Sequence, residues 1–322
     1  MRSLTLVSVL LAATCWADAA VLLFPAVGTP GQVTLSGRVL KHAPSTGSST
    51  FSKNLRRLTS PNWQGAPVEI RYAGRRVEVA SGHDGNFSVT LSGEKQPFEV
   101  GLTTAEAFVK GAEAGIATVD IIAPEAEFFV VSDFDDTLAV TNVLSTSKLV
   151  KAALMQDETN QPVVDGMAEF YGCLKEDKAA RPGFALVSGS PAQYLSRVRS
   201  FLNGHGFPVF GIYLRDLGPS TLSNYKQPVI RSLLEEIPNP VVLIGDSGEH
   251  DPEVYAQMRA EFPDRVKAIY IRNAGRADDA KRFTGMVLFK TAKEAAYDAV
   301  TQGLASAQCV SRAFPEATAV LK

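Results

Sequence analysis

The sequence predicts an α/β protein in two parts, a small antiparallel β-sandwich followed by a parallel sheet with helices on both faces. Its 322 residues are enough for two domains. Short segments that alternate apolar and polar residues fill the first part, as half-buried strands do. After Pro124, longer helical segments alternate with short apolar strands, which is typical of βαβ units. Polar side chains follow several of these strands, at the sheet edge where such folds bind ligands.

Residues 1–19 have the pattern of a cleavable secretory signal. Arg2 precedes an apolar stretch over residues 4–13, and Ala17 and Ala19 are small residues spaced for cleavage. The apolar stretch is too short to span a bilayer. A buried first strand is the alternative, because residues 21–24 prolong the hydrophobicity. We expect export to the periplasm or the medium.

The cysteine content and the net charge exclude several classes of protein. After loss of the signal only Cys173 and Cys309 remain, which allows at most one disulfide. Cys173 lies in an apolar helical pattern and is most simply a core residue. The net charge of −2 argues against a nucleic-acid partner. No later segment is long and apolar enough to cross a membrane.

Residues 20–124 are expected to form the β-sandwich. Half-buried strands are predicted at 33–40, 68–72, 76–79, 87–91, 98–102 and 117–122. Residues 82–85 supply a turn between two of them, and His83 is interpreted as a solvated turn residue. The predicted sandwich contains no cluster of catalytic side chains.

A basic, Ser-rich segment, residues 41–65, interrupts these strands. Its cations Lys41, Lys53, Arg56 and Arg57 are interleaved with apolar residues. A loop with one short helix explains this composition, and contact with an anionic lipid surface is the alternative.

Residues 125–306 are expected to form the parallel sheet and its helices, and residues 307–322 a C-terminal tail. Apolar strands are predicted at 128–131, 184–187, 209–214, 241–244 and 266–271. Helices are predicted at 144–154, 167–178, 191–202, 228–236, 253–261 and 292–304, with Asp165 as a possible N-cap and Pro191 in a first turn.

The strand at 128–131 delivers a dense group of acids. Asp133, Asp135 and Asp136 follow it directly, and Thr137 closes the group. Residues two apart in an extended chain point to one face, so Asp133 and Asp135 can act as a pair. Such a pair can divide nucleophilic attack from general acid–base catalysis. Packed anions also call for a divalent cation, and hard oxygen ligands favour Mg²⁺. A solvated acidic turn is the alternative.

Two more predicted strands end in polar residues. Residues 184–187 lead into Ser188 and Gly189, where a hydroxyl and backbone N–H groups before a helix are suited to phosphate. Residues 241–244 lead into Gly245 and Asp246, with Asp251 shortly after, which adds carboxylates for a cation.

Lys226 precedes the predicted helix at 228–236, between these two strands in the sequence. Its ammonium group is suited to stabilising a carboxylate nucleophile and a transferring phosphoryl group. Helix capping or solvation explains each of these residues separately, but not all of them at successive element ends.

In this order, Asp133-Phe-Asp-Asp-Thr137, Ser188, Lys226 and Gly245-Asp246 resemble the haloacid dehalogenase superfamily of phosphohydrolases. Residues 132–143, 164–174, 186–208, 212–216 and 241–273 resemble more closely the actin-patch phosphatidate phosphatases, relatives of the lipins. The resemblance covers about residues 128–273 and implies a haloacid dehalogenase-like Rossmannoid fold.

The resemblance also implies roles. Asp133 would be the nucleophile and Asp135 the acid and then the base; Thr137, Ser188 and Gly189 would hold the phosphate, and Lys226 would stabilise charge. Mg²⁺ would be held by Asp133, the main-chain carbonyl of Asp135, Asp246 and Asp251. One departure follows the strand at 184–187, where the family usually has Asn after the residue matching Ser188 and an aromatic residue after the one matching Pro191. Here these positions are Gly189 and Ala192.

We therefore expect an exported, Mg²⁺-dependent phosphatidate phosphatase that acts on a phospholipid at a membrane surface. Few residues separate Thr137 from the strand at 184–187, which leaves little room for a lid and suits an open site. One alternative is a broad phosphomonoesterase on soluble esters or phosphoproteins. The other is a non-catalytic binding module built on the β-sandwich. The oligomeric state stays open.

Overall fold

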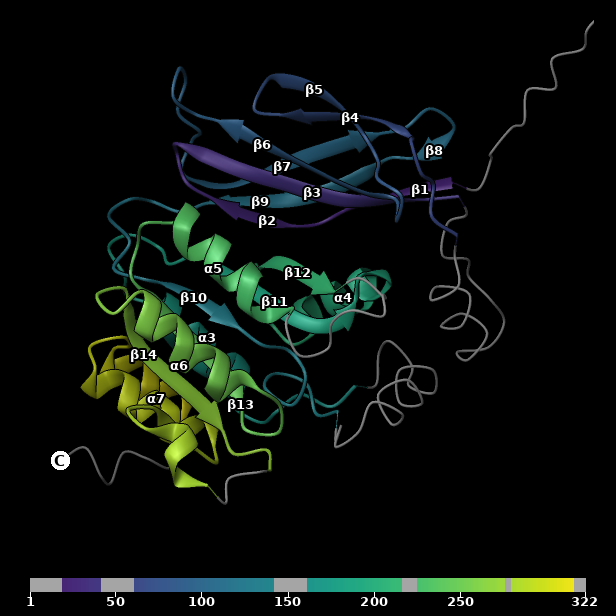
Figure 1. Cartoon of the computed structure of the whole chain (residues 1–322). Helices are drawn as coiled ribbons and strands as arrows, with labels where there is room; N and C mark the ends of the chain where they lie inside the picture. The colour runs from purple at the N-terminus through teal and green to yellow at the C-terminus, as the bar shows by residue number, and fades with distance from the viewer. Residues whose placement is uncertain (1–18, 42–60, 142–160, 216–224, 276–278, 316–322) are drawn as a thin grey trace, which may run out of the picture.

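The computed structural model describes residues 19–41, 61–141, 161–215, 225–275 and 279–315. They form two sheets, one above the other in Figure 1, with helices packed only around the second. We call the first, from β1 to β9, sheet A and the second, from β10 to β15, sheet B. The predicted helix at 144–154, most of the basic segment 41–65 and nearly all of the predicted signal lie outside the described residues.

Sheet A comprises β1 (Ala19–Leu23), β2 (Ala26–Gly28), β3 (Gln32–Leu40), β4 (Pro67–Tyr72), β5 (Arg75–Ala80), β6 (Asn86–Ser92), β7 (Gly101–Phe108), β8 (Ala112–Glu113) and β9 (Gly115–Ile121). The order is β5-β4-β7-β9-β2-β3-β1-β8, and β6 pairs with β3. Most pairs are antiparallel, whereas β1 with β8 and β2 with β9 are parallel. Hydrogen bonds thus join one nine-stranded sheet, where two separate sheets were expected.

The alternation of apolar residues explains how sheet A encloses a core. Val33 and Leu35 of β3 share one buried cluster with Ile70 of β4 and Val119 of β9. Because β5 at one end of the order also contacts β6, the sheet folds over on itself. Residues 21–23 belong to the buried strand β1, which accounts for the hydrophobicity that continues after the predicted signal. Export itself stays a prediction.

One predicted strand of sheet A is wrong. The strand expected at 98–102 begins only at Gly101. Phe98 is buried without being in a strand, because its ring packs 5.3 Å from that of Tyr72 and its N–H bonds the carbonyl of Pro30. An apolar residue that fills the core from a loop carries the same sequence signal as one in a strand.

Sheet B is parallel throughout its pairs. It contains β10 (Phe129–Ser132), β11 (Phe184–Pro191), β12 (Gly211–Arg215), β13 (Val241–Asp246), β14 (Val266–Arg272) and β15 (Val287–Phe289). The order is β12-β11-β10-β13-β14-β15. The central strands β10 and β13 are buried along their whole length, which explains their unbroken apolar sequences.

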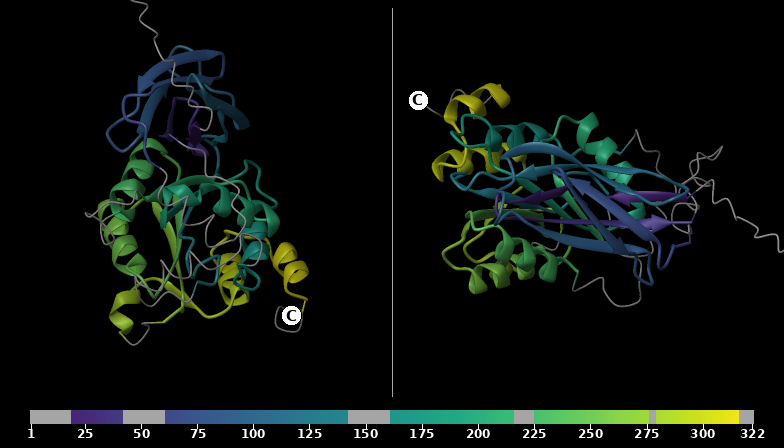
Figure 2. Two further views of the ribbon diagram at one scale, coloured as in Figure 1. Left: turned by 90° about the vertical axis from the view of Figure 1, so that its right-hand side faces the viewer. Right: turned by 90° about the horizontal axis from the view of Figure 1, so that it is seen from above.

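Helices cover both faces of sheet B, as predicted. They are α3 (Met167–Lys175), α4 (Leu195–Gly204), α5 (Lys226–Glu236), α6 (Asp251–Glu261), α7 (Ala292–Thr301) and α8 (Ala307–Ala313). Val130 of β10 packs in one cluster with α3, α4, α7 and α8, and Val131 in another with α5 and α6. Figure 2 shows these two helical layers on either side of the strands. A mixed α/β architecture with a parallel sheet is therefore present.

Several predicted helix bounds are wrong, and the segments at 167–178 and 191–202 differ most. The N-cap of α3 is Gly166, with φ of 74°, rather than Asp165, and the helix ends at Lys175. The segment predicted as one helix at 191–202 begins as strand, because β11 continues to Pro191. A 3₁₀ helix, η1 (Ala192–Tyr194), then leads into α4. Pro191 therefore ends a strand instead of opening a helix.

Cys173 of α3 and Cys309 of α8 form a disulfide. Their Cα atoms are 5.5 Å apart, and 136 residues of sequence separate them. Cys173 is therefore both a core residue and a bridged one. The bridge also shows that residues 307–313, predicted as tail, form a helix that belongs to the sheet B half.

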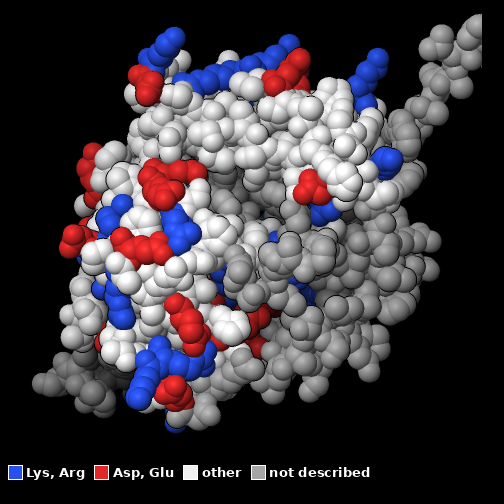
Figure 3. Space-filling view, viewed as in Figure 1, with Lys and Arg blue, Asp and Glu red and all other residues white. Residues whose placement is uncertain are grey.

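Specific contacts fix the two halves against each other. The N–H of Ile212 in β12 bonds the carbonyl of Pro25, 2.7 Å away. Arg181 donates two hydrogen bonds to the buried Asp120, one of 2.9 Å. Positive and negative side chains are intermixed on the face in Figure 3. No helix within the described residues has the length and apolarity to cross a membrane.

Candidate active site

The predicted site residues converge at the carboxyl edge of sheet B. Asp133 follows β10, Ser188 lies near the end of β11, and Asp246 ends β13. The first residues of two helices complete the group, Lys226 of α5 and Asp251 of α6. All of these side chains are buried, together with Asp135 and Thr137. Polar groups in such a place need partners, and their partners are informative.

Asp133 lies between a cation and a hydroxyl. Its Oδ1 forms an ion pair with Lys226 Nζ at 2.8 Å, and its Oδ2 accepts a hydrogen bond of 3.2 Å from Thr137. Burial raises the pKa of Asp133 well above its usual value, and the Lys226 ammonium acts against this rise. The tight turn that brings Thr137 back to Asp133 places Asp136 at a φ of 54°.

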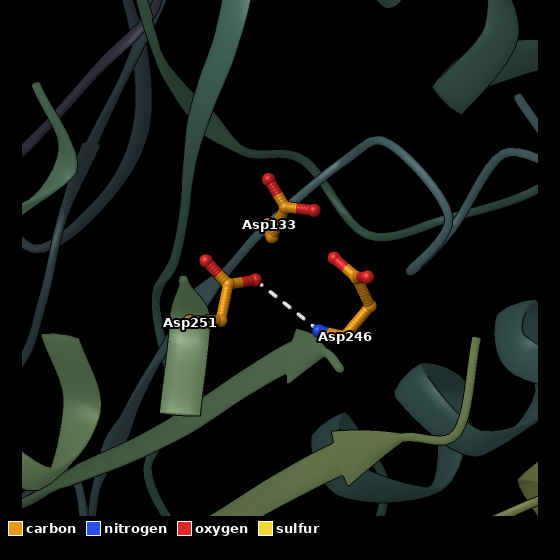
Figure 4. A group of neighbouring side chains, drawn as sticks. All are labelled: Asp133, Asp246 and Asp251. Atoms are coloured by element: carbon orange, nitrogen blue, oxygen red, sulfur yellow. Dashed lines mark hydrogen bonds between the residues drawn. The ribbon is translucent and has the colours of Figure 1, made fainter. Parts of the chain in front are cut away.

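Three carboxylates converge beside Lys226. Asp133, Asp246 and Asp251 each offer an oxygen, and these atoms lie within 4.8 Å of one another. Figure 4 shows the three side chains directed toward a common space. Asp246 Oδ1 accepts a 2.6 Å hydrogen bond from the N–H of Gly248, whereas Oδ2 is buried with no hydrogen-bond partner among the described residues. This cluster fits a divalent cation with oxygen ligands.

The electrostatics of the cluster support the same conclusion. Burial, and then the neighbouring Asp251, raise the pKa of Asp246 to about 8. Without a cation, one carboxylate would thus retain a proton at neutral pH. A cation would replace that proton and complete the coordination of Asp246 Oδ2.

Gly245 is required for the approach of Asp251. A Cβ at position 245 would lie 2.4 Å from Asp251 Oδ2. The glycine leaves room for this carboxylate to accept a 3.2 Å hydrogen bond from the N–H of Asp246. The absence of a side chain at Gly245 therefore serves a close side-chain approach.

Asp135 faces the end of β11. Its Oδ2 accepts hydrogen bonds from Ser190 at 2.8 Å and from Ser188 at 3.2 Å. Burial and the charge of Glu249 raise the pKa of Asp135 to about 6, against the two hydroxyl hydrogen bonds and Lys226. A carboxyl group with this pKa can exchange a proton near neutral pH. Beside Ser188, a Cβ added to Gly189 would meet open space.

Lys226 contacts three acids. Its Nζ lies 2.6 Å from Asp251 Oδ1 and 3.2 Å from Glu249 Oε2, in addition to Asp133. Burial alone would lower the pKa of Lys226, but the three carboxylates outweigh burial and raise it. The amine therefore keeps its proton and its positive charge.

Several supporting residues were missed by the sequence analysis. Ser190 and Glu249 lie within the stretches 186–208 and 241–273 that carry the family resemblance, but no role was predicted for them. Arg282 bonds the carbonyls of Ser247 at 3.0 Å and Glu249 at 2.9 Å, and so holds the loop after β13. Arg272 donates a 2.5 Å hydrogen bond to the carbonyl of Asp136. Arginines that bind main-chain carbonyls carry no sequence signal of that function.

A tyrosine of α3 supports the end of β10. The hydroxyls of Tyr171 and Ser132 lie 2.7 Å apart, and Ser132 donates a 2.6 Å hydrogen bond to the carbonyl of Asp133. The backbone at Asp133 is therefore held from the helix side of the sheet as well as by β13, whose Ile244 carbonyl accepts the N–H of Asp133.

The fold and the site define an α/β protein whose acidic strand ends, lysine and hydroxyl groups are suited to phosphoryl transfer. Residues 128–273 match the family model described as phosphatidate phosphatase APP1, catalytic domain. This match and the relatives below confirm the resemblance to the actin-patch phosphatidate phosphatase family over residues 128–273.

Two relatives share this region. Phosphatidate phosphatase APP1 of Saccharomyces cerevisiae is 31% identical over 150 residues, covering 44% of this chain and 25% of the relative. An uncharacterised protein of Schizosaccharomyces pombe is 30% identical over 182 residues, covering 54% of this chain and 29% of the relative. The aligned region thus spans under a third of either relative. The solved Pnkp1/Rnl/Hen1 complex, 18% identical over 47% of each chain with a TM-score of 0.34, is too dissimilar to inform the fold.

Proposed function

We propose that this protein is a Mg²⁺-dependent phosphatidate phosphatase with a haloacid dehalogenase-like catalytic domain, which converts phosphatidate to diacylglycerol and phosphate. The observation that carries the proposal is the 2.8 Å contact between Asp133 and Lys226, beside a carboxylate cluster, in a domain that matches the APP1 catalytic model. The substrate is inferred from that of the yeast relative, phosphatidate phosphatase APP1.

The reaction divides between Asp133 and Asp135. The Asp133 carboxylate attacks phosphorus, the bond from phosphorus to the ester oxygen breaks, and the leaving alkoxide takes the proton of Asp135. Asp135 then removes a proton from water, which attacks the aspartyl-phosphate, releases phosphate and restores both acids. The raised pKa of Asp135, about 6, suits both proton transfers.

Charge on the phosphoryl group is balanced by the surrounding residues. Lys226 is positioned at Asp133 and remains protonated, so it stabilises the anion as it is transferred. Thr137 and Ser188 supply hydroxyl donors, and Gly189 supplies backbone close to the substrate. Asp133, the carbonyl of Asp135, Asp246 and Asp251 would hold Mg²⁺, which supplies positive charge at the phosphoryl oxygens.

Export and membrane contact are part of the proposal. The disulfide between α3 and α8 supports an oxidising compartment, since structural disulfides are rare in the cytosol. The signal pattern of residues 1–19 points the same way.

Phosphate release from phosphatidate in mixed micelles tests the function. We expect release that requires Mg²⁺ and is lost in Asp133→Asn, with Asp165→Asn, an exposed acid of the same half, as the matched control. Release from soluble phosphate esters but not from phosphatidate would keep the mechanism and favour the broad phosphomonoesterase. Failure to release phosphate from any ester would contradict the proposal and favour a binding module.

A further inference from the structure

A cavity of about 350 Å³ lies between the two halves, outside the site described above. Ser36, Phe87 and Ser88 line it from sheet A, and Ile212, Leu214 and Tyr225 line it from the other half. Figure 1 shows β12 below sheet A, and β12 contacts β2 and β9. The two halves thus create a space that neither would have alone.

The described part of the lining is mainly apolar. Phe24 and Phe87 contribute rings on one side, Ile212 and Leu214 aliphatic groups on the other, and none of the lining residues that the structure describes carries a charge. The Tyr213 hydroxyl accepts a 3.5 Å hydrogen bond from the N–H of Val27. Hydroxyl and amide groups come from Ser36, Asn86, Ser88, Tyr213 and Tyr225, and the larger share of the lining surface is apolar. A lining of this kind favours a hydrocarbon group over a polar ligand.

Two lining residues connect the cavity to the catalytic residues. Leu214 pairs in register with Ser188 on the neighbouring strand β11. Tyr225 directly precedes Lys226, the cation beside Asp133. The cavity therefore begins one strand away from the phosphate hydroxyl and one residue away from the lysine.

The edge of β12 is partly occupied by the chain itself, which argues against a peptide in the cavity. An added strand would need the free N–H and carbonyl groups of this edge. The N–H of Ile212 already bonds the carbonyl of Pro25. One of the backbone groups that an added strand would need is therefore already used.

We infer that this cavity binds the hydrocarbon chain of the phosphate ester whose phosphate is held at Asp133 and Lys226. The inference deepens the proposed function and rests on its phosphate site. The cavity volume lies at the lower end of the range for ligand sites, about 300–1,000 Å³. It therefore suits part of one chain, and the rest of a lipid would stay outside.

Binding of alkylphosphonates tests the inference without turnover. The series runs from ethyl- to decylphosphonate, each kept below its aggregation concentration, and affinities are measured by calorimetry with Mg²⁺ on the unmodified protein. Each methylene that enters the cavity should lower Kd about three- to fourfold, until the cavity is full.

Two variants locate the effect. Ser88→Trp places a large ring in the cavity and should remove most of the affinity gain from ethyl to decyl. Ser92→Trp makes the same change at an exposed position farther along β6, outside the cavity lining, and should keep that gain. If Ser88→Trp does not fold, as judged by its thermal transition, Ser88→Phe replaces it.

The outcomes separate the two proposals. A gain along the series that Ser88→Trp abolishes supports the cavity, even if no ester is hydrolysed. Equal affinities for ethyl- and decylphosphonate, or a gain that survives at Ser88→Trp, overturns it. Hydrolysis of phosphatidate with no such gain would keep the enzyme and reject the cavity.

Discussion

The two halves of the molecule treat buried polar groups in opposite ways. Among the described residues of the sheet A half, the buried charged side chains are Arg38 and Asp120. Arg38 is bonded to Asn62, and Asp120 to Arg181. In the sheet B half, buried acids gather at one edge, and Asp246 Oδ2 is left without a hydrogen bond among the described residues. The first arrangement stabilises the fold; the second leaves binding capacity unused, as functional sites do.

The largest expected effect comes from Asp246→Asn. Loss of a metal-binding carboxylate should lower kcat/KM on the order of a hundredfold or more, because the phosphoryl charge loses its counter-ion. In the absence of metal, Asp246→Asn should be more stable than the unmodified protein, because the variant no longer buries a carboxyl group that would be charged in water. Phosphate release with Mg²⁺ and thermal unfolding in a chelator measure the two effects separately.

The pH dependence checks the sign of this stability effect. The folded pKa of Asp246, about 8, lies above its usual 3.8. The folded protein then binds more protons than the unfolded chain, so metal-free stability should fall as pH rises from about 4 to 8. Asp246→Asn should flatten that fall. A variant that is less stable in chelator at every pH would contradict this account of the site.

The disulfide should matter to stability and not to the chemistry. Replacing Cys173 and Cys309 by serine removes a link across 136 residues and should lower the free energy of unfolding by about 2–5 kcal/mol. Urea unfolding measures the loss, and a reductant should reproduce it in the unmodified protein. The kcat of the folded double variant should stay within about twofold of that of the unmodified protein. A large loss of kcat would show that α3 transmits the change to Asp133 through Tyr171.

Arg181→Met tests whether the polar pairs of the sheet A half serve the fold alone. It leaves Asp120 buried without its cation and should destabilise the protein by about 1–3 kcal/mol, since Arg181 is itself 29% exposed. Adding Asp120→Asn should recover part of the loss in a double-mutant cycle. Phosphate release by the folded fraction should be unchanged, unlike that of Asp246→Asn.

The sequence could predict the features whose signal is local in the chain. Alternation located β3, β4, β5, β6 and β9, and the polar residues after apolar strands located Asp133, Ser188 and Asp246. Both signals are local in the chain. The disulfide, the support from Arg282 and the hydrogen bond from Ser190 to Asp135 depend on which distant groups meet in space. Phe98 shows the same limit, because an apolar residue that fills the core from a loop gives the same sequence pattern as one in a strand.

The smallest expected effect is that of Ser190→Ala, and it tests the least visible residue of the site. The Ser190 hydroxyl donates to the charged form of Asp135 and so lowers the pKa of that carboxyl group. Removing the hydroxyl should raise this pKa by less than about one unit. Protonated Asp135 is the form that donates to the leaving group, so the alkaline limb of the kcat profile should move to higher pH. Ser232→Ala, an exposed serine of α5, is the control. A kcat that falls equally at all pH values, with no movement of the limb, would mean that Ser190 positions the substrate instead of tuning Asp135.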